Sequence, residues 1–233
     1  MTYHEPWTVG YLEEKFARPD PWKYLTSPYE QTKYMRQIEI IKDRRPQPRR
    51  ILEIGSAEGA HTLILAESFP SASITAIEIS SKAIDRAREK LKTYKDRVEL
   101  SNADIIEYES RIDDGSFDVC VWSESIYYVG ARASLNETYR LLEKIVGKLC
   151  PNGILVMANT IDLPEDIPES VITKRPIIDC YYRLLSSLAA PAQKATYFDE
   201  KFGRVYEYQI WAFFRLTPSN KVQFLRRPAI TTG

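Results

Sequence analysis

Hydrophobic and polar positions follow two different periods along the chain, and together they predict strands that alternate with helices. Five short apolar runs are typical of buried strands and lie at residues 50–54, 73–79, 98–100, 117–122 and 154–157. Around them, apolar side chains recur every three or four residues, which predicts amphipathic helices over 29–44, 60–69, 135–149 and the stretch after Ser80. Strands separated by such helices form βαβ units, so we expect a parallel sheet with helices on both faces.

The pattern changes after residue 160, where the sequence predicts one more helix and then a hairpin. The helix is indicated by a stripe of Tyr181 and three leucines. Two β-like runs, 196–198 and 205–214, flank residues 202–204, which suit a hairpin turn. An antiparallel pair at this place brings the sheet to seven strands. The expected fold is a doubly wound, Rossmann-like α/β domain whose mixed sheet is mostly parallel with an antiparallel strand seven.

Length and local composition indicate one domain with a segment on either side. The chain has 233 residues, which suits a single large α/β domain. Residues 1–28 are rich in proline and aromatic side chains, and we expect a packed irregular arm or a flap over a cofactor. Residues 29–216 form the expected domain, with elements at about 160–195 that cap an acceptor site. Residues 217–233 have no strong pattern and are assigned as a loose tail.

Composition and charge exclude some partners but identify none. Thirty-two basic and thirty-two acidic residues give a formal net charge of zero, so no bulk attraction to nucleic acid or to an anionic membrane is expected. The three cysteines form no closely spaced pair, and no run is long and apolar enough for a signal segment or a membrane span. We therefore expect a cytoplasmic protein without a metal, which acts on a small molecule as a monomer or a homodimer.

The most informative stretch is Ile-Leu-Glu-Ile-Gly-Ser-Ala-Glu-Gly-Ala at residues 51–60, which indicates a strand, a glycine turn and a helix. In an open α/β sheet, ligands bind at the carboxyl ends of the strands, where this turn lies. Gly55 allows a ligand to approach the main chain, and Gly59 allows a tight entry into the helix. Ser56 and Ala57 lie in the turn, whose backbone N–H groups face the same edge.

Side chains around this turn discriminate between two cofactors. A dinucleotide site needs Gly-x-Gly-x-x-Gly, so that a pyrophosphate can lie against bare backbone, but Ala57 and Ala60 replace two of the glycines. Glu53 would also bring a carboxylate near that pyrophosphate, which is repulsive. The same carboxylate favours the cationic sulfonium and ammonium groups of S-adenosylmethionine, directly or through water. The turn therefore favours this methyl donor over NAD(P).

Two more strand ends carry acidic residues that suit an adenosine. Glu78 ends the second strand, next to Ile79, and its carboxylate can accept hydrogen bonds from both ribose hydroxyls. An exposed strand-end glutamate is the alternative. Asp104 follows the third strand, between Ala103 and Ile105; it can accept the adenine amino group while Ile105 covers the ring. A helix N-cap is the alternative for Asp104 and does not exclude the first role.

The fourth strand runs into Ser-Glu-Ser-Ile-Tyr-Tyr at residues 123–128, the edge that would face the transferable methyl group. Glu124 can bind or deprotonate an ammonium group. Tyr127 and Tyr128 can line an acceptor pocket or pack against the next helix. His61, in the first turn after the glycine turn, is a candidate base, although a histidine there also suits capping or packing. These four residues are the candidate catalytic groups.

Together these residues resemble the class I methyltransferases and, within them, the nodulation (NodS-type) N-methyltransferases. The resemblance covers residues 15–160 and fades afterwards. It is carried by Asp20-Pro21-Trp22, Tyr29-Glu30, Lys33-Tyr34, residues 52–60, Ala83-Ile84-Asp85-Arg86-Ala87-Arg88, Phe117-Asp118-Val119 and residues 123–128.

The resemblance implies how the cofactor is held. In that family the amino-terminal arm folds over the bound donor, so Trp22 and Tyr29 become expected cofactor contacts. The resemblance also implies donor-binding positions for Glu53, Gly55, Glu78, Asp104 and Ser123. Known nodulation members methylate an amine of a chito-oligosaccharide. Because residues after 160, among them Asp162 and Asp166, depart from the family pattern, that acceptor is not carried over to this chain.

The expected activity is a metal-independent transfer of a methyl group from S-adenosylmethionine to an amine, or to a hydroxyl, of a small metabolite, with S-adenosylhomocysteine as product. Direct in-line transfer depends mainly on alignment of the two substrates. Nitrogen is favoured because a neutral amine needs no base and histidines are few. Natural-product biosynthesis is a fitting setting. A nicotinamide oxidoreductase and a non-catalytic methyltransferase-like binding module are the two alternatives.

Overall fold

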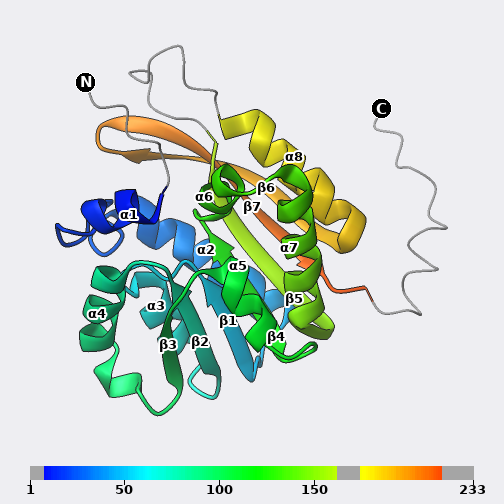
Figure 1. Ribbon diagram of the computed structural model, residues 1–233, viewed down its shortest axis with the longest axis horizontal. Helices are drawn as coiled ribbons and strands as arrows, with labels where there is room; N and C mark the ends of the chain where they lie inside the picture. Colours follow the sequence, from blue (N-terminus) through cyan, green and yellow to red (C-terminus); the bar gives the residue numbers. More distant parts are fainter. Residues whose placement is uncertain (1–7, 162–173, 217–233) are drawn as a thin grey trace.

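A seven-stranded sheet forms the centre of the protein in the computed structural model (Figure 1). The structure describes residues 8–161 and 174–216. The strands lie in the order β3-β2-β1-β4-β5-β7-β6. Neighbours among the first five pair in parallel, whereas β7 is antiparallel to both β5 and β6. The predicted mixed sheet with an antiparallel strand seven is confirmed. The bounds are β1 Arg50–Ile54, β2 Ser73–Glu78, β3 Val98–Asn102, β4 Phe117–Ser123, β5 Leu149–Thr160, β6 Ala190–Lys201 and β7 Arg204–Phe214.

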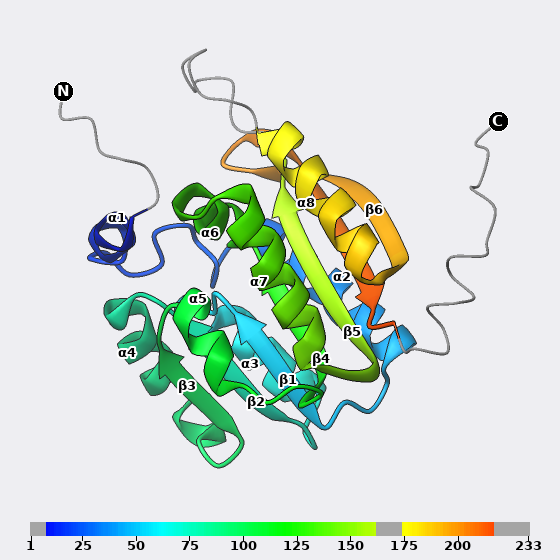
Figure 2. The ribbon, with the colours of Figure 1, turned by 45° about the vertical axis from the view of Figure 1, so that its right-hand side comes forward.

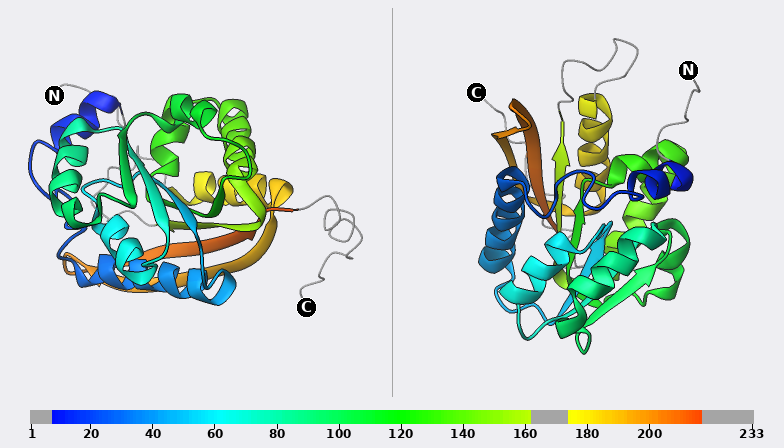
Figure 3. Two further views of the ribbon diagram at one scale, coloured as in Figure 1. Left: turned by 90° about the horizontal axis from the view of Figure 1, so that it is seen from below. Right: turned by 90° about the vertical axis from the view of Figure 1, so that its left-hand side faces the viewer.

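Helices cover both faces of this sheet (Figures 2 and 3). Apolar side chains of β4 alternate between the two faces, so that Cys120 and Trp122 join the core under α5 to α8, and Val119 and Val121 join the core under α2 to α4. The doubly wound arrangement is therefore confirmed, as is the burial of Cys120. The bounds are α1 Val9–Lys15, α2 Pro28–Arg44, α3 Ala60–Ser68, α4 Ser81–Lys90, α5 Ile105–Tyr108, α6 Ile126–Arg132, α7 Leu135–Lys148 and α8 Lys174–Leu188.

The hairpin of β6 and β7 is longer than its sequence pattern indicates. The turn consists of Phe202 and Gly203 alone, with φ values of 56° and 76°; positive φ at both positions gives the type I′ geometry that matches the twist of antiparallel strands. Arg204, expected in the turn, already belongs to β7. The strand β6 begins at Ala190 instead of residue 196, because edge pairing with β7 tolerates Pro191 at a register shift.

The amino-terminal arm is fastened to the carboxyl edge of the sheet, and it contains the short helix α1, which the sequence pattern did not predict. In α1, the Glu13 carboxylate accepts a hydrogen bond from the Ser81 N–H of α4 at 2.6 Å. Further along, the Glu58 carboxylate accepts the Asp20 N–H at 2.9 Å and the Arg86 Nε–H at 2.7 Å. The arm is therefore tied both to the glycine turn and to α4.

Some predicted features lie outside the described residues. These are the first seven residues, the tail 217–233 and the part of the acceptor cap at 162–173, which includes Asp162 and Asp166. The helix predicted from the stripe of Tyr181 and three leucines is present as α8, and Tyr181 on it is buried. Of the helices that the structure describes, none has the length and apolar character needed to cross a bilayer.

Candidate functional site

One pocket opens at the carboxyl ends of β1, β2 and β4, the edge where the sequence predicts a ligand site. Its volume is about 940 Å³ with the open mouth included. The arm closes one side of it. The predicted residues that line it are Trp22, Glu53, Gly55, Ser56, Ala57, His61, Glu78, Ile79, Ala103, Asp104, Ile105, Ser123, Glu124 and Tyr128. Three predicted site residues, Tyr29, Gly59 and Tyr127, lie outside the lining.

Glu53 lies near the end of β1 and is buried against the base of α3. Its Oε2 atom accepts a hydrogen bond from Thr62 Oγ1 at 2.6 Å. Burial raises the pKa of Glu53 to about 7; the Thr62 hydrogen bond opposes this shift, and the negative charge of Glu78 adds to it. A cationic ligand group at this position would favour the carboxylate form. Glu53 therefore lines the pocket as an acid that lacks a cationic partner among the residues that the structure describes.

Glu78 ends β2 and is buried, so the alternative of an exposed strand-end glutamate is wrong. Its two oxygens accept backbone hydrogen bonds at 2.9 Å, from the Ala57 N–H and from the Ser80 N–H. These bonds fix the carboxylate between the glycine turn and the start of α4. Burial raises the pKa of Glu78, and backbone hydrogen bonds from Ser80, Ala57 and Ile79 oppose the shift. An ionised carboxylate offers about four acceptor positions, so the Glu78 carboxylate retains capacity for a ligand donor.

Packing within the protein requires glycine at both ends of the glycine turn. Gly55 has a φ of 77°, and a Cβ atom there would lie 2.5 Å from Ser125 Oγ. The need for glycine at 55 thus comes from the close approach of the segment after β4, in addition to the open pocket. Gly59, with a φ of 75°, caps α3, and a Cβ there would lie 2.9 Å from Leu91 Cδ1. Gly59 therefore allows α3 to pack against α4, as the predicted tight entry required.

Asp104 performs the capping role that was its alternative. Its Oδ1 atom accepts the Ile106 N–H at 3.0 Å and so caps α5. The same carboxylate is held by Arg132 of α6, whose two terminal nitrogens lie 2.6 and 3.2 Å from its oxygens. Arg132 lines the pocket and was missed by sequence reasoning, because 28 residues separate the partners. Ala103 and Ile105 line the pocket on either side of Asp104.

Aromatic side chains of the arm and of α2 form another part of the pocket wall. Trp22 lies against Tyr24, with ring centroids 5.6 Å apart, and both rings line the pocket. Tyr34 of α2 lines it too and stacks on His61. Tyr29, the other expected aromatic contact, packs instead beside Tyr208, and its hydroxyl lies 3.3 Å from Thr160 Oγ1. Tyr24 and Tyr34 thus occupy the pocket wall where Tyr29 was expected.

His61 lies deep in the pocket wall, buried between Tyr34 and Glu53. Its ring is stacked on Tyr34 with centroids 4.5 Å apart. Neither ring nitrogen has a hydrogen-bond partner among the described residues. Burial and the positive charge of Lys33 lower the pKa of His61 to about 3. The imidazole is therefore neutral at physiological pH, which is the state a base needs, but its pKa makes it a weak one.

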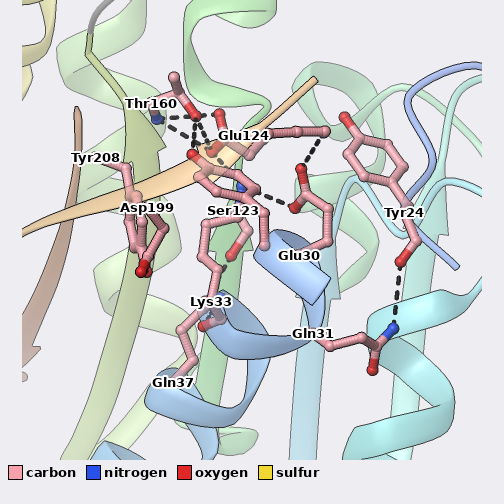
Figure 4. Close-up of polar contacts among 12 residues, drawn as sticks. Tyr24, Glu30, Gln31, Lys33, Gln37, Ser123, Glu124, Thr160, Asp199 and Tyr208 are labelled. Carbon is pink, nitrogen blue, oxygen red and sulfur yellow. Dashed lines mark hydrogen bonds and ion pairs between the residues drawn. The ribbon is translucent and has the colours of Figure 1, made fainter. Parts of the chain in front are cut away.

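Glu124 and Ser123 at the end of β4 are held by hydrogen bonds and an ion pair with other side chains of the protein (Figure 4). Lys33 Nζ lies 2.6 Å from Glu124 Oε1, and Tyr127 donates its hydroxyl to Glu124 Oε2 at 2.9 Å. Ser123 donates its hydroxyl to Gln37 of α2. Tyr128 lines the pocket, whereas Tyr127 does not. Lys33 is fully buried, and no local pattern indicates its pairing with Glu124, because 91 residues separate the two.

The comparisons with known proteins agree with this geometry. Residues 8–163 match the family model described as nodulation protein S (NodS). The chain is 28% identical over 152 residues to nodulation protein S of Bradyrhizobium diazoefficiens, which covers 65% of this chain and 68% of that protein. It is 27% identical over 146 residues to a carboxy-S-adenosyl-L-methionine synthase of Nautilia profundicola, which covers 63% of this chain and 57% of that protein.

Among solved structures, the N-methyltransferase NodS of Bradyrhizobium japonicum WM9, in complex with S-adenosylhomocysteine, superposes with a TM-score of 0.72. The match has 20% sequence identity and covers 90% of this chain and 98% of that one. It shows that the two chains share a fold. The match to the NodS family model decides against a nicotinamide oxidoreductase.

Proposed function

Because the chain belongs to the nodulation protein S (NodS) family and is an S-adenosylmethionine-dependent methyltransferase, we propose that it moves the donor's methyl group to an amine nitrogen of a small molecule by direct in-line transfer. The observation that carries the proposal is the pair Glu53 and Glu78. They lie on neighbouring strands and line one pocket, whose wall also contains the rings of Trp22, Tyr24 and Tyr34.

The charges in this pocket fit the donor. Glu53 lacks a cationic partner in the described residues, and burial makes its charge unfavourable, so a positively charged sulfonium or ammonium group nearby supplies the missing charge. Ser56 Oγ is buried, has no hydrogen-bond partner within residues 8–161 and 174–216, and can receive a polar group of the ligand. A pyrophosphate would instead meet two carboxylates at the same edge.

The second acidic residue suits the ribose. The Ala57 and Ser80 N–H groups hold the Glu78 carboxylate in one orientation, so little conformational freedom is lost when it accepts ribose hydroxyls. Asp104, held by Arg132, and Ile105 line the next part of the wall and are assigned to the adenine. Trp22 and Tyr24 of the arm then cover the ligand and exclude water.

When bound, S-adenosylmethionine supplies an electrophilic methyl group on a positively charged sulfur. The chain's own residues orient the two substrates, and good orientation is equivalent to effective concentrations of roughly 10⁵–10⁸ M. An amine that arrives neutral can attack without help from a base. A hydroxyl needs a base, and His61 is a weak one because of its lowered pKa. Nitrogen is therefore the proposed acceptor atom, and the cytosol, where free cysteines persist, is the proposed setting.

Calorimetry tests the donor site first. S-adenosylhomocysteine should bind and NAD(P) should not. Glu53→Ala and Glu78→Ala should each weaken binding by about 10- to 100-fold, the effect of about 1.5–3 kcal/mol for a hydrogen bond to a charged group. Glu89→Ala, an exposed glutamate of α4, is the control. Unchanged affinity in both pocket variants would rule out this donor site.

A transfer assay with labelled methyl donor then tests the acceptor. The panel contains amino sugars, aromatic amines, phenols and indoles. Label should appear on amines and not on phenols, and it should be lost when the amine is replaced by a hydroxyl. Donor binding without transfer to any member of a broad amine panel would contradict the proposal and favour a non-catalytic binding module.

A further inference from the structure

A buried charge cluster adjoins the pocket, because its member Glu124 lies in the pocket lining. Figure 4 shows Glu124 with its neighbours Lys33 and Glu30. Lys33 of α2 has 1% of its side chain exposed, and its Nζ atom lies 2.6 Å from Glu124 Oε1 and 2.8 Å from Glu30 Oε2. On the far side, Lys201 Nζ of β6 lies 2.5 Å from Glu30 Oε1. Two lysines thus balance two carboxylates in the interior. Buried ion pairs often stabilise a fold no more than apolar residues of similar volume do, so this cluster calls for another role.

The carboxylate of Glu124 is occupied by donors of the chain. Lys33 Nζ and Thr160 Oγ1 each lie 2.6 Å from Oε1. The Thr160 N–H lies 3.1 Å from both oxygens, and Tyr127 donates to Oε2. An ionised carboxylate offers about four acceptor positions. Four donor groups from α2, β5 and α6 use them here, which leaves little capacity for the proton of an acceptor amine.

The backbone at Glu124 shows the same constraint. Its φ of 54° is in the left-handed region, which disfavours a residue with a Cβ atom. This conformation turns the chain from β4 into α6, and the Glu124 N–H donates to the Ala158 carbonyl at 2.8 Å. The first turn of α6 carries Tyr127 and Tyr128, whose ring centroids are 4.6 Å apart. Tyr127 is hydrogen-bonded to Glu124 and its ring contacts that of Tyr128. Glu124 is therefore linked through Tyr127 to the position of Tyr128 in the pocket wall.

We propose that Lys33 and Glu124 are positioning residues, which fix Tyr127 and, through it, set Tyr128 in the wall that receives the acceptor. This inference rests on the proposed function. Glu124 then serves as an anchor and not as a base. The inference also gives a role to the Glu30 and Lys33 segment of α2, which the donor site does not use: Glu30 holds Lys33, and Lys33 holds Glu124.

The test uses Lys33→Met, Glu124→Gln and the double variant in the full-length protein. Lys33→Met leaves Glu30 paired with Lys201, and Glu124 with Thr160, so the remaining charges keep partners. Thr160→Val, which removes one hydroxyl, is a milder variant if folding suffers. Lys148→Met is the matched control, because Lys148 is also a buried, ion-paired lysine but lies at the end of α7, away from the pocket.

Two readouts are combined. The fluorine NMR signal of Tyr128 in protein labelled with 3-fluorotyrosine, assigned with Tyr128→Phe, reports the position of the ring without any acceptor. Kinetics with the amine that the panel identifies report the acceptor KM and kcat, and calorimetry reports S-adenosylhomocysteine affinity. Because the NMR readout needs no acceptor, it decides the positioning even if the proposed function fails.

We expect Lys33→Met and Glu124→Gln to move or broaden the Tyr128 signal and to raise the acceptor KM by about tenfold, since displacement of about 1 Å costs up to about 10²-fold. Donor affinity should stay within about threefold, and the double variant should be no worse than either single one, as for residues that act as a unit. A Tyr128 signal like that of Lys148→Met would overturn the proposal. So would a loss of kcat by about 10²-fold or more in Glu124→Gln at unchanged KM, which is the signature of a base.

Discussion

The Nδ1 atom of His61 lies 3.6 Å from Glu53 Oε1, and both side chains are buried. Proximity of an imidazole and a carboxylate often signals an ion pair, but here burial moves both groups toward their neutral forms. It raises the pKa of Glu53 to about 7 and lowers the pKa of His61 to about 3. The neutral imidazole does not balance the charge of an ionised Glu53, so a cationic ligand can pair with this carboxylate.

Donor affinity should depend on pH through Glu53. A cationic group binds the ionised carboxylate, so affinity for S-adenosylhomocysteine should rise as pH increases through about 7, where Glu53 loses its proton. Calorimetry in buffers of different ionisation enthalpy should detect the released proton below that pH. Glu53→Gln should bind weakly with no such pH dependence. A wild-type affinity that stays constant across this range would contradict the assignment of Glu53.

The same group should shape the stability of the ligand-free protein. The folded pKa of Glu53 lies above its ordinary value of 4.5, so the folded state binds this proton more tightly than the unfolded state does. Its contribution is therefore fully present below about pH 4.5 and is lost as pH rises through about 7. Thermal unfolding of Glu53→Gln should lack this decline, whereas wild type saturated with S-adenosylhomocysteine should recover stability at the higher pH.

Replacing His61 with phenylalanine should stabilise the protein. The change removes two buried ring nitrogens that have no hydrogen-bond partner in the described part of the chain, and it keeps the stack on Tyr34. A gain of about 1 kcal/mol is expected, which raises Tm by about 2–4 °C in a chain of this size. Differential scanning calorimetry measures it.

Because the folded pKa of His61 is depressed, wild type should also lose stability as pH falls from about 6.5 toward 3, and His61→Phe should lose less. A loss of methyl transfer by about 10²-fold or more in this variant would instead make His61 a base.

Gly55→Ala should destabilise the fold more than Gly203→Ala. The two glycines have similar φ values, 77° and 76°, but a Cβ at 55 would lie 2.5 Å from Ser125 Oγ, whereas a Cβ at 203 meets nothing within 4 Å. Backbone strain alone should cost about 1 kcal/mol at 203, and overpacking should add about 1–3 kcal/mol at 55. Denaturant unfolding measures both. Ser125→Gly in the Gly55→Ala background should recover part of the difference; equal losses at the two glycines would show that the Ser125 contact is unimportant.

Arg86→Met should loosen the arm. The Arg86 guanidinium donates to Glu58 Oε1 and to the Phe16 carbonyl, both at 2.7 Å, and so links α4 to the glycine turn and to the arm. Because Arg86 is partly exposed, we expect its removal to weaken the binding free energy of S-adenosylhomocysteine by about 1 kcal/mol, which corresponds to about fivefold faster dissociation. Stopped-flow fluorescence of Trp22 measures this rate. The control is Arg88→Met on the same helix, because Arg88 forms an ion pair with the exposed Asp85. Identical rates in the two variants would exclude a role of this link.

Much of the fold and of the donor pocket could be predicted because local signals determine them. The alternation of apolar runs and amphipathic stretches fixed the βαβ order, and parallel strands place their carboxyl ends at one edge. Glu53, the glycine turn and Glu78 therefore had to meet there. The helix α1 escaped prediction because a seven-residue helix between prolines and aromatic residues has a weak periodic signal, and its docking on Ser81 comes from a contact across 68 residues.

Sequence alone determined which residues carry charge and which edge of the sheet they reach. Only the tertiary structure decided what each charge does. Glu124 looked like a free base, yet Lys33, 91 residues away, and Thr160 occupy its carboxylate. Tyr29 turns into the core beside Tyr208, and Tyr24 lines the pocket. The reason is physical: strand periodicity is a property of neighbours along the chain, whereas the partner of a buried polar group is whichever group the packing of distant segments brings within hydrogen-bond distance.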